Sequence, residues 1–119
     1  MPISMQHERD NIYRLEVSGV LKKSDLDRSQ ELLVAEMDRI GSTRLLFILK
    51  EFKGWETNPN WGDLTFYVNH GKSIERIAIV GDERWRAESL MFASADLRRA
   101  PVEFFPESAV AEARAWLSA

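Results

Sequence analysis

The side chains best suited to acid–base chemistry in this sequence are those of its two histidines, His7 and His70. His70 follows Asp63 by seven residues, a spacing that places both on one face of a helix, two turns apart. His7 lies far away in a predicted edge strand, and two separated histidines with no third ligand at helical spacing are weak support for a metal site. A histidine beside Gly71 near a helix end is far more often only a polar terminal residue. We therefore expect a non-enzymatic protein with no catalytic residue, no metal and no cofactor.

Phosphate-binding chemistry also lacks its usual signals. None of the six glycines falls into GxGxxG or GxxxxGK[ST] spacing. Asp82 and Glu83 stand at a predicted helix N-terminus, where carboxylates satisfy the helix dipole themselves and repel a phosphate. The lysines and arginines are scattered and the net charge is -3, so we expect no nucleic-acid partner.

Large aromatic side chains are the stronger signal. The segment LKEFKGWETNPNWGDLTFY, residues 49–67, combines them with charges and turn formers directly after an apolar run. The candidate ligand-binding residues are Trp55, Trp61, Phe66, Tyr67, Trp85 and Phe92. They follow the third and fourth predicted strands, and ligands of open α/β sheets bind outside the carboxyl ends of strands. The surplus of apolar surface indicates a pocket, a dimer face or a thicker core, and residue types alone do not choose among these.

The elements that position these residues follow the order ββαβαβαβα. Alternation of apolar and polar residues over 12–18 predicts a half-buried strand, paired as a hairpin with residues 3–8. Continuous apolar runs at 45–49, 77–80 and 102–105 predict buried strands that alternate with helices. We expect one α/β domain over 1–119, a five-stranded mixed sheet with one antiparallel edge and covering helices.

Local signals predict where these elements end. We expect Gly19 to break the second strand, and Ser24 to cap the first helix. Gly81 should permit the turn after the fourth strand. Asp82 should cap a third helix that runs to about Arg99.

The composition is typical of a globular domain, with 45% hydrophobic and 29% charged residues among 119. The longest apolar run, Leu45 to Leu49, is too short to cross a membrane. No signal peptide is visible at the N-terminus, and the chain has no cysteine. We expect a cytoplasmic protein with no membrane span.

Taken in order, several segments resemble the SpoIIAA-like family of the STAS/Sec14-type fold, small bacterial proteins related to anti-sigma-factor antagonists and to CRAL-TRIO lipid-transfer domains. These segments are FKGWE, RIAIVGDERW, VEFFP and AEARAWL, with Trp61 between the first two. The resemblance implies a βα superhelical fold and suggests ligand binding or regulation. It does not imply the phospho-switch of the antagonists, because the corresponding stretch KEFKGWETNPNWGD has Thr57 as its only hydroxyl and lacks their Ser-Gly pair.

The leading hypothesis is a binding domain for an apolar or amphipathic small molecule, lipid-like, in a crevice between the second and third helices. The six aromatic residues named above would line the crevice, and Lys53, Asp82 or Arg84 at its rim could orient a polar head. The alternative is a protein-interaction or regulatory module in which the same surface forms a homodimer or docks a partner; an enzyme is the third reading. We also expect residues 55–67 to form a movable cover over the carboxyl ends of the third and fourth strands. The alternative is that Trp55 and Trp61 are permanently docked as part of the core.

Overall fold

The structure, a computed structural model, describes residues 3–57, 69–93 and 100–119 of the chain. The strands, in chain order, are β1 (Ile3–Arg9), β2 (Ile12–Leu21), β3 (Thr43–Trp55), β4 (Ile74–Gly81) and β5 (Val102–Pro106). The helices are α1 (Lys23–Ile40), α3 (Arg86–Phe92) and α4 (Val110–Ser118), with short 3₁₀ helices η1 (Gly71–Ser73), η2 (Glu83–Trp85) and η3 (Glu107–Ala109). These elements follow the predicted order, and most of the predicted second helix lies outside the described residues.

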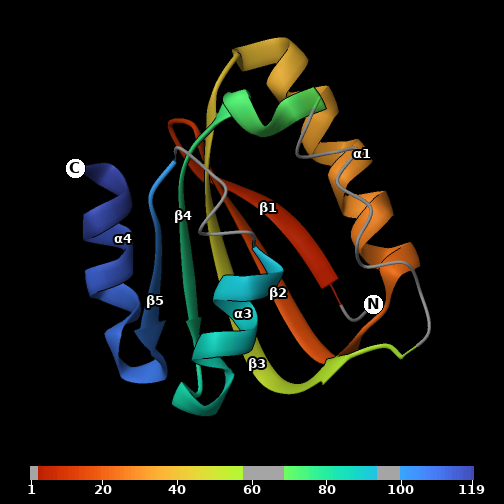
Figure 1. The fold of residues 1–119 in the computed structure, drawn as a ribbon. Coiled ribbons are helices and arrows are strands. Elements are labelled where there is room, and N and C mark those ends of the chain that lie inside the picture. The colour runs from red at the N-terminus through yellow and green to blue at the C-terminus, as the bar shows by residue number, and fades with distance from the viewer. Residues whose placement is uncertain (1–2, 58–68, 94–99) are drawn as a thin grey trace.

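The five strands form one mixed sheet in the order β1-β2-β3-β4-β5 (Figure 1). Strand β1 runs antiparallel to β2, and the three following pairs are parallel. The predicted α/β architecture, a five-stranded sheet with one antiparallel edge, is confirmed.

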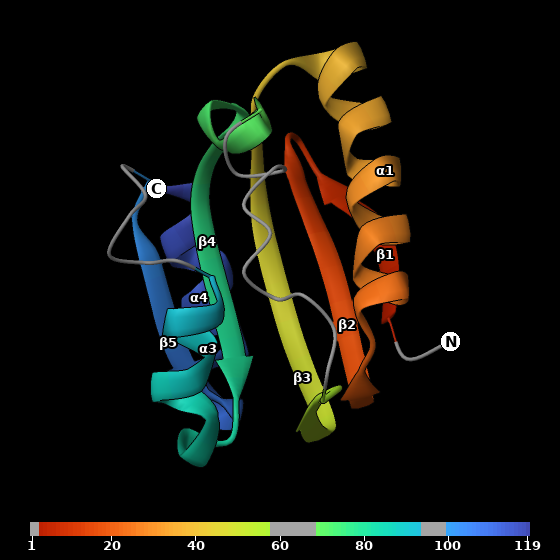
Figure 2. The same cartoon turned by 45° about the vertical axis from the view of Figure 1, so that its right-hand side comes forward.

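Helices cover both faces of the sheet (Figures 1 and 2). Helix α4 packs against β3, β4 and β5 on one face, where Leu46, Ala78 and Leu117 are completely buried. On the other face, which we call the α1/α3 face, α1 lies beside β1 and β2 and α3 lies beside β4 and β5. Ile48 is buried on the α4 face and Ile79 on the α1/α3 face, as expected of central parallel strands. In the described part of the chain, no helix is long and apolar enough to span a membrane.

Helix α1 begins two residues earlier than predicted, and a distant side chain accepts a hydrogen bond from its first turn. Ser24 was expected to be the N-cap, but it lies within the helix, so that prediction is wrong. The carboxylate of Glu56, just beyond β3, accepts a hydrogen bond of 3.1 Å from the backbone N–H of Lys23. An acidic group at this position satisfies a free N–H and is favourable at the positive end of the helix. At the other end, Gly41 has a φ of 90° and donates its N–H to the carbonyl of Met37.

Strands β2 and β3 extend beyond their predicted ends because their pairing is irregular. Gly19, with a φ of 63°, was expected to break β2, but the strand continues to Leu21. On β3, Glu51 and Lys53 have no paired residue on β2. Each is an extra residue that the ladder accommodates as a bulge. The backbone of Glu51 has a φ of 49°, a left-handed conformation that is uncommon for a residue with a side chain.

Trp55 is the last residue of β3 and pairs with Leu21. The next amide, that of Glu56, donates to the carbonyl of Leu21 at 2.9 Å. Trp55 therefore lies on a strand and not in the loop expected there, which corrects the start of the expected cover. The mobility of the segment stays a prediction. Residues 58–67 of the expected cover lie outside the described residues.

Gly81 is the last residue of β4, and packing, not turn conformation, requires a glycine there. Its φ is not positive, so the predicted role in permitting the turn does not apply. A Cβ atom on Gly81 would lie 2.9 Å from Cδ1 of Leu49, closer than two carbons can approach. The predicted third helix begins as η2 and continues as α3, which ends at Phe92, short of Arg99; residues 94–99 are outside the described ranges.

Candidate functional site: an aromatic cluster at the strand ends

Four aromatic rings meet on the α1/α3 face near the carboxyl end of β3. This aromatic cluster consists of Phe52, Trp55, Trp85 and Phe92. The ring centroid of Trp55 lies 4.9 Å from Phe52, 5.8 Å from Trp85 and 5.4 Å from Phe92. The Phe52, Trp55 and Trp85 rings are edge to face with one another, an arrangement that favours aromatic pairs by about 0.5–1.5 kcal/mol beyond area burial.

Three of the six predicted site residues are thus brought together: Trp55, Trp85 and Phe92. Each packs against the core and remains half-buried. The other three, Trp61, Phe66 and Tyr67, lie outside the described residues. Sequence reasoning missed Phe52, which is 4% exposed and contacts both tryptophans.

The irregular pairing of β3 places Phe52 and Trp55 on the same face. In a regular strand, residues three positions apart point to opposite faces. Lys53 lies between them as an extra residue with no partner on β2, so the alternation is shifted by one. The three-residue spacing of Phe52 and Trp55 is the signal in the sequence that could have revealed the bulge, because a regular strand would place these two side chains on opposite faces.

Trp85 is positioned by the turn that follows β4. Asp82 caps η2, because its Oδ1 accepts a hydrogen bond of 3.0 Å from the backbone N–H of Arg84, as predicted. The indole of Trp85 then lies against Gly54, where a Cβ atom would be 3.5 Å from Cη2 of the ring. Gly54 has a φ of 105°, a conformation that only glycine adopts readily.

One charged side chain lies against Trp85, and two others near it in the sequence pair with each other. The guanidinium carbon of Arg84, an exposed residue, lies 5.0 Å from the centroid of the Trp85 ring, within reach of a cation–π interaction. Arg86 donates two hydrogen bonds to Glu83, of 2.6 and 2.8 Å, and these hold the pKa of the Glu83 carboxyl below its ordinary value. Of the predicted rim residues, Arg84 lies beside the cluster, Asp82 serves as a cap, and Lys53 is an exposed neighbour of Phe52.

Two buried polar atoms in this region have no hydrogen-bond partner within the described part of the chain: Nε1 of Trp55 and Oγ of Ser89. Ser89 is 4% exposed on α3. Ser29, a serine of α1 that is 5% exposed, instead donates to the carbonyl of Leu26 at 2.8 Å. A buried polar group without a partner reduces stability by about 1–3 kcal/mol.

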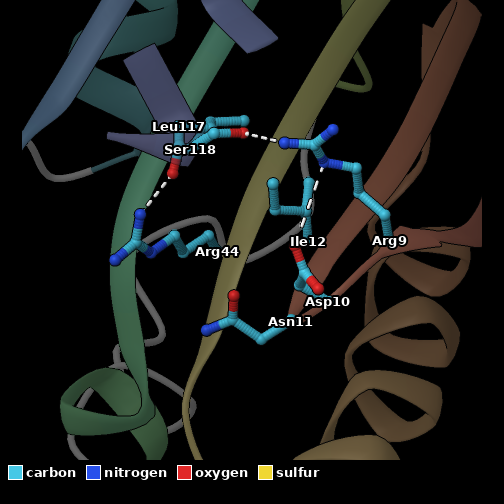
Figure 3. Close-up of a pocket in the computed structure, with 7 residues that line it drawn as sticks. All are labelled: Arg9, Asp10, Asn11, Ile12, Arg44, Leu117 and Ser118. Atoms are coloured by element: carbon cyan, nitrogen blue, oxygen red, sulfur yellow. Dashed lines mark hydrogen bonds and ion pairs between the residues drawn. The ribbon is translucent and has the colours of Figure 1, made fainter. Parts of the chain in front are cut away.

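A hollow of about 230 Å³ lies at the end of the sheet opposite to the aromatic cluster (Figure 3). Its lining comprises Arg9, Asp10, Asn11, Ile12, Arg44, Leu117 and Ser118. Sequence analysis missed it, because these residues come from the β1–β2 turn, the start of β3 and the end of α4 and form no motif.

The charged side chains of this hollow are paired within the protein. Arg44 donates from Nε to Glu75 at 2.9 Å and from Nη1 to the backbone carbonyl of Leu117. Arg9 donates to the hydroxyl of Ser118 at 3.0 Å. Arg44 thereby satisfies a carbonyl at the C-terminal end of α4, which is a structural role. The aromatic cluster is the better candidate for a binding site.

The histidines contribute no further candidate. Nε2 of His7 donates to the backbone carbonyl of Asp10 at 2.6 Å, within the β1–β2 hairpin. His70 directly precedes η1, and Asp63 is outside the described residues. Over residues 3–57, 69–93 and 100–119, no three His, Asp or Glu side chains are grouped so that they could hold a metal ion.

Comparisons with known proteins concern the fold as a whole. A protein-family model described as SpoIIAA-like matches residues 12–118. The crystal structure of an uncharacterized protein from Shewanella loihica with a SpoIIAA-like fold is similar to this chain, with a TM-score of 0.73 and 22% sequence identity. The likeness covers 97% of this chain and 91% of that chain, and at this identity it shows the fold alone. A comparison with curated proteins gives no match.

Proposed function

This chain belongs to the SpoIIAA-like family, and from that premise we propose that it is a binding domain for an apolar or amphipathic small molecule. The observation that carries the proposal is the aromatic cluster, in which Trp55, Trp85 and Phe92 pack together and yet remain half-buried. Trp55 ends β3, and Trp85 follows β4 after one short turn. Open α/β sheets bind their ligands at this edge.

The physical basis of binding is the apolar surface that the half-buried rings leave in water. An alkyl chain that covers this surface is stabilised by about 25 cal/mol for each Å² of apolar area removed from water. Flat, rigid rings also lose little conformational entropy when a ligand packs against them. Arg84, over the outer side of Trp85, supports an orienting role for the rim. Trp61, Phe66 and Tyr67 stay proposed members of the site from their place in the sequence.

Displacement of the fluorescent probe N-phenyl-1-naphthylamine by dodecanol tests the proposal. We expect both molecules to bind the purified protein, and Trp85→Leu to weaken binding by about five- to thirty-fold, the equivalent of roughly 1–2 kcal/mol of lost apolar contact. Trp116→Leu is the matched control, because Trp116 lies on α4 and packs with Phe105 on the opposite face of the sheet.

The control should bind both molecules as the unaltered protein does. Circular dichroism establishes that both variants fold. If the unaltered protein binds neither molecule and an organic extract of it contains no apolar compound, the proposal is wrong.

A second candidate function, a protein-interaction or regulatory module, is favoured by one observation. Met91 is 77% exposed beside Phe92, so α3 presents an apolar side chain to water at the edge of the aromatic cluster. We propose a second copy of this chain as the partner in this case. Sedimentation velocity would then show a dimer that Met91→Glu dissociates, and a monomer at all concentrations would exclude it.

A further inference from the structure

We propose that the ligand of the aromatic cluster carries an uncharged carbonyl oxygen, as in a long-chain ester or amide, and that Trp55 and Ser89 hold this oxygen. The inference rests on the proposed function and specifies the chemical class of its ligand. It is carried by the two buried polar atoms without partners, Nε1 of Trp55 and Oγ of Ser89.

The indole of Trp55 defines what is missing. Its N–H can donate a hydrogen bond and cannot accept one. Buried indole N–H groups usually have a partner, and this one has none among the residues that the structure describes. The group that would complete the site is therefore a hydrogen-bond acceptor.

Ser89 lies in the same neighbourhood. Phe92 follows it by three residues within α3, a spacing that places both side chains on one side of the helix. The rings of Trp85 and Phe92 both contact Trp55, at 5.8 and 5.4 Å between centroids. A buried helical serine normally donates to a carbonyl of the preceding turn, as Ser29 does on α1. The hydroxyl of Ser89 is buried and has no partner among the described residues, so a ligand oxygen that entered beside it would accept its hydrogen bond.

The charges near the site favour an uncharged oxygen over a carboxylate. Arg84 is exposed and lies over the Trp85 ring, and Arg86 is held by Glu83. With the cations of the described residues placed in this way, a carboxylate between Trp55 and Ser89 would be buried without one of them as a partner, which is far more unfavourable than burying a carbonyl that accepts two hydrogen bonds.

Three probes that share a twelve-carbon chain separate the contribution of the oxygen from that of the chain: methyl laurate, dodecane and laurate, each used to displace N-phenyl-1-naphthylamine. We expect methyl laurate to bind about five-fold more tightly than dodecane for each hydrogen bond formed, the equivalent of about 1 kcal/mol per bond. Trp55→Phe and Ser89→Ala should each reduce that preference by about five-fold. Ser29→Ala is the matched control, because its hydroxyl is already bonded to Leu26, and it should retain the full preference.

The indole N–H of Trp55 gives a second readout in ¹⁵N-labelled protein. Its resonance is assigned by its loss in Trp55→Phe. Methyl laurate should move it downfield as the hydrogen bond forms, and dodecane should not. Because Ser89→Ala removes only an unpartnered hydroxyl, that variant should fold, and circular dichroism checks this.

Each contrary outcome is informative. Equal affinity for methyl laurate and dodecane, with the Trp55 resonance unmoved, would overturn this inference and leave the proposed function intact. Tighter binding of laurate that depends on Arg84, tested with Arg84→Gln, would place a charged head at the rim and also overturn it. If none of the three probes displaces the dye, the proposed function itself fails and the inference with it.

Discussion

Arg114 of α4 forms a two-point ion pair with Glu8 of β1, with its Nη2 2.7 Å from Oε1 and its Nε 3.1 Å from Oε2. The two residues are 106 positions apart in the sequence. The pair connects the last helix to the edge strand, although α4 itself packs against β3, β4 and β5. The side chain of Glu8 is 15% exposed, and Arg14 of β2 approaches the same carboxylate at 3.4 Å. This paired carboxylate, set among arginines, makes stability depend on pH.

We predict that the free energy of unfolding decreases as the pH falls below about 4.3, the ordinary pKa of a glutamate. The hydrogen bonds from Arg114 hold the pKa of Glu8 below that value in the folded protein. A lowered folded-state pKa means that the stabilisation is present above the ordinary pKa and is lost as the pH falls through the folded-state pKa. Urea unfolding at a series of pH values measures this dependence.

Two variants make the pH experiment specific. Glu8→Gln should be less stable near neutral pH and should lose less stability on acidification, because the titrating group is gone. Glu31→Gln, on the exposed side of α1, is the matched control and should retain the acid dependence. If Glu8→Gln keeps the full dependence, the pair does not contribute to it.

The two buried serines should respond to truncation with opposite signs. Ser89→Ala removes an unpartnered hydroxyl and should raise the free energy of unfolding by about 1 kcal/mol in the absence of ligand. Ser29→Ala removes a hydrogen bond of 2.8 Å to Leu26 and should lower it by about 1 kcal/mol. Thermal or urea unfolding of both variants decides the matter. A loss of stability in Ser89→Ala would mean that its hydroxyl has a partner in the folded protein.

Asp82 should act as a cap through hydrogen bonding and not through its charge. Asp82→Ala should lower stability by about 0.5–2 kcal/mol, because the N–H of Arg84 loses its acceptor. Asp82→Asn keeps an acceptor oxygen in the same place and should be much milder. Urea unfolding measures both, and equal losses would indicate a role that depends on charge.

The parts of the fold that follow from local pattern were predictable from the sequence. The runs at 45–49 and 77–80 lie on strands covered by helices on both faces, so their residues are apolar without alternation. Trp55, Trp85 and Phe92 were placed together because parallel strands bring the segments after their carboxyl ends to one edge of the sheet.

The parts that depend on distant partners or unusual backbone were not predictable. The cap of α1 comes from Glu56, a residue of the β3 end, and a search of the residues beside the helix finds Ser24 instead. The bulge at Glu51 has no local signal, since glutamate rarely adopts a positive φ. Ser89 is not recognisable from the sequence as a member of the proposed site, because a polar residue gives no sign that it is buried on the packed face of α3.

The last prediction concerns the bulge that precedes the aromatic cluster. Glu51 has a φ of 49°, and this conformation is unfavourable by about 1–2 kcal/mol for a residue with a Cβ atom. Glu51→Gly relieves that strain. It also gives the unfolded chain more conformational entropy, which lowers the free energy of unfolding by about 0.5–1 kcal/mol, so the stability of the variant should equal or exceed that of the native protein. Glu51→Val should be less stable by about 1–2 kcal/mol, because a β-branched side chain tolerates this backbone least.

Lys53 provides the matched control for the bulge, because it is exposed, unpaired on β2 and two residues away, yet its φ is not positive. Lys53→Gly relieves no strain and should lower stability by about 0.5–1 kcal/mol, opposite in sign to Glu51→Gly. Urea unfolding followed by tryptophan fluorescence measures all three variants. Equal losses of stability in the two glycine variants would show that the backbone of Glu51 is unstrained.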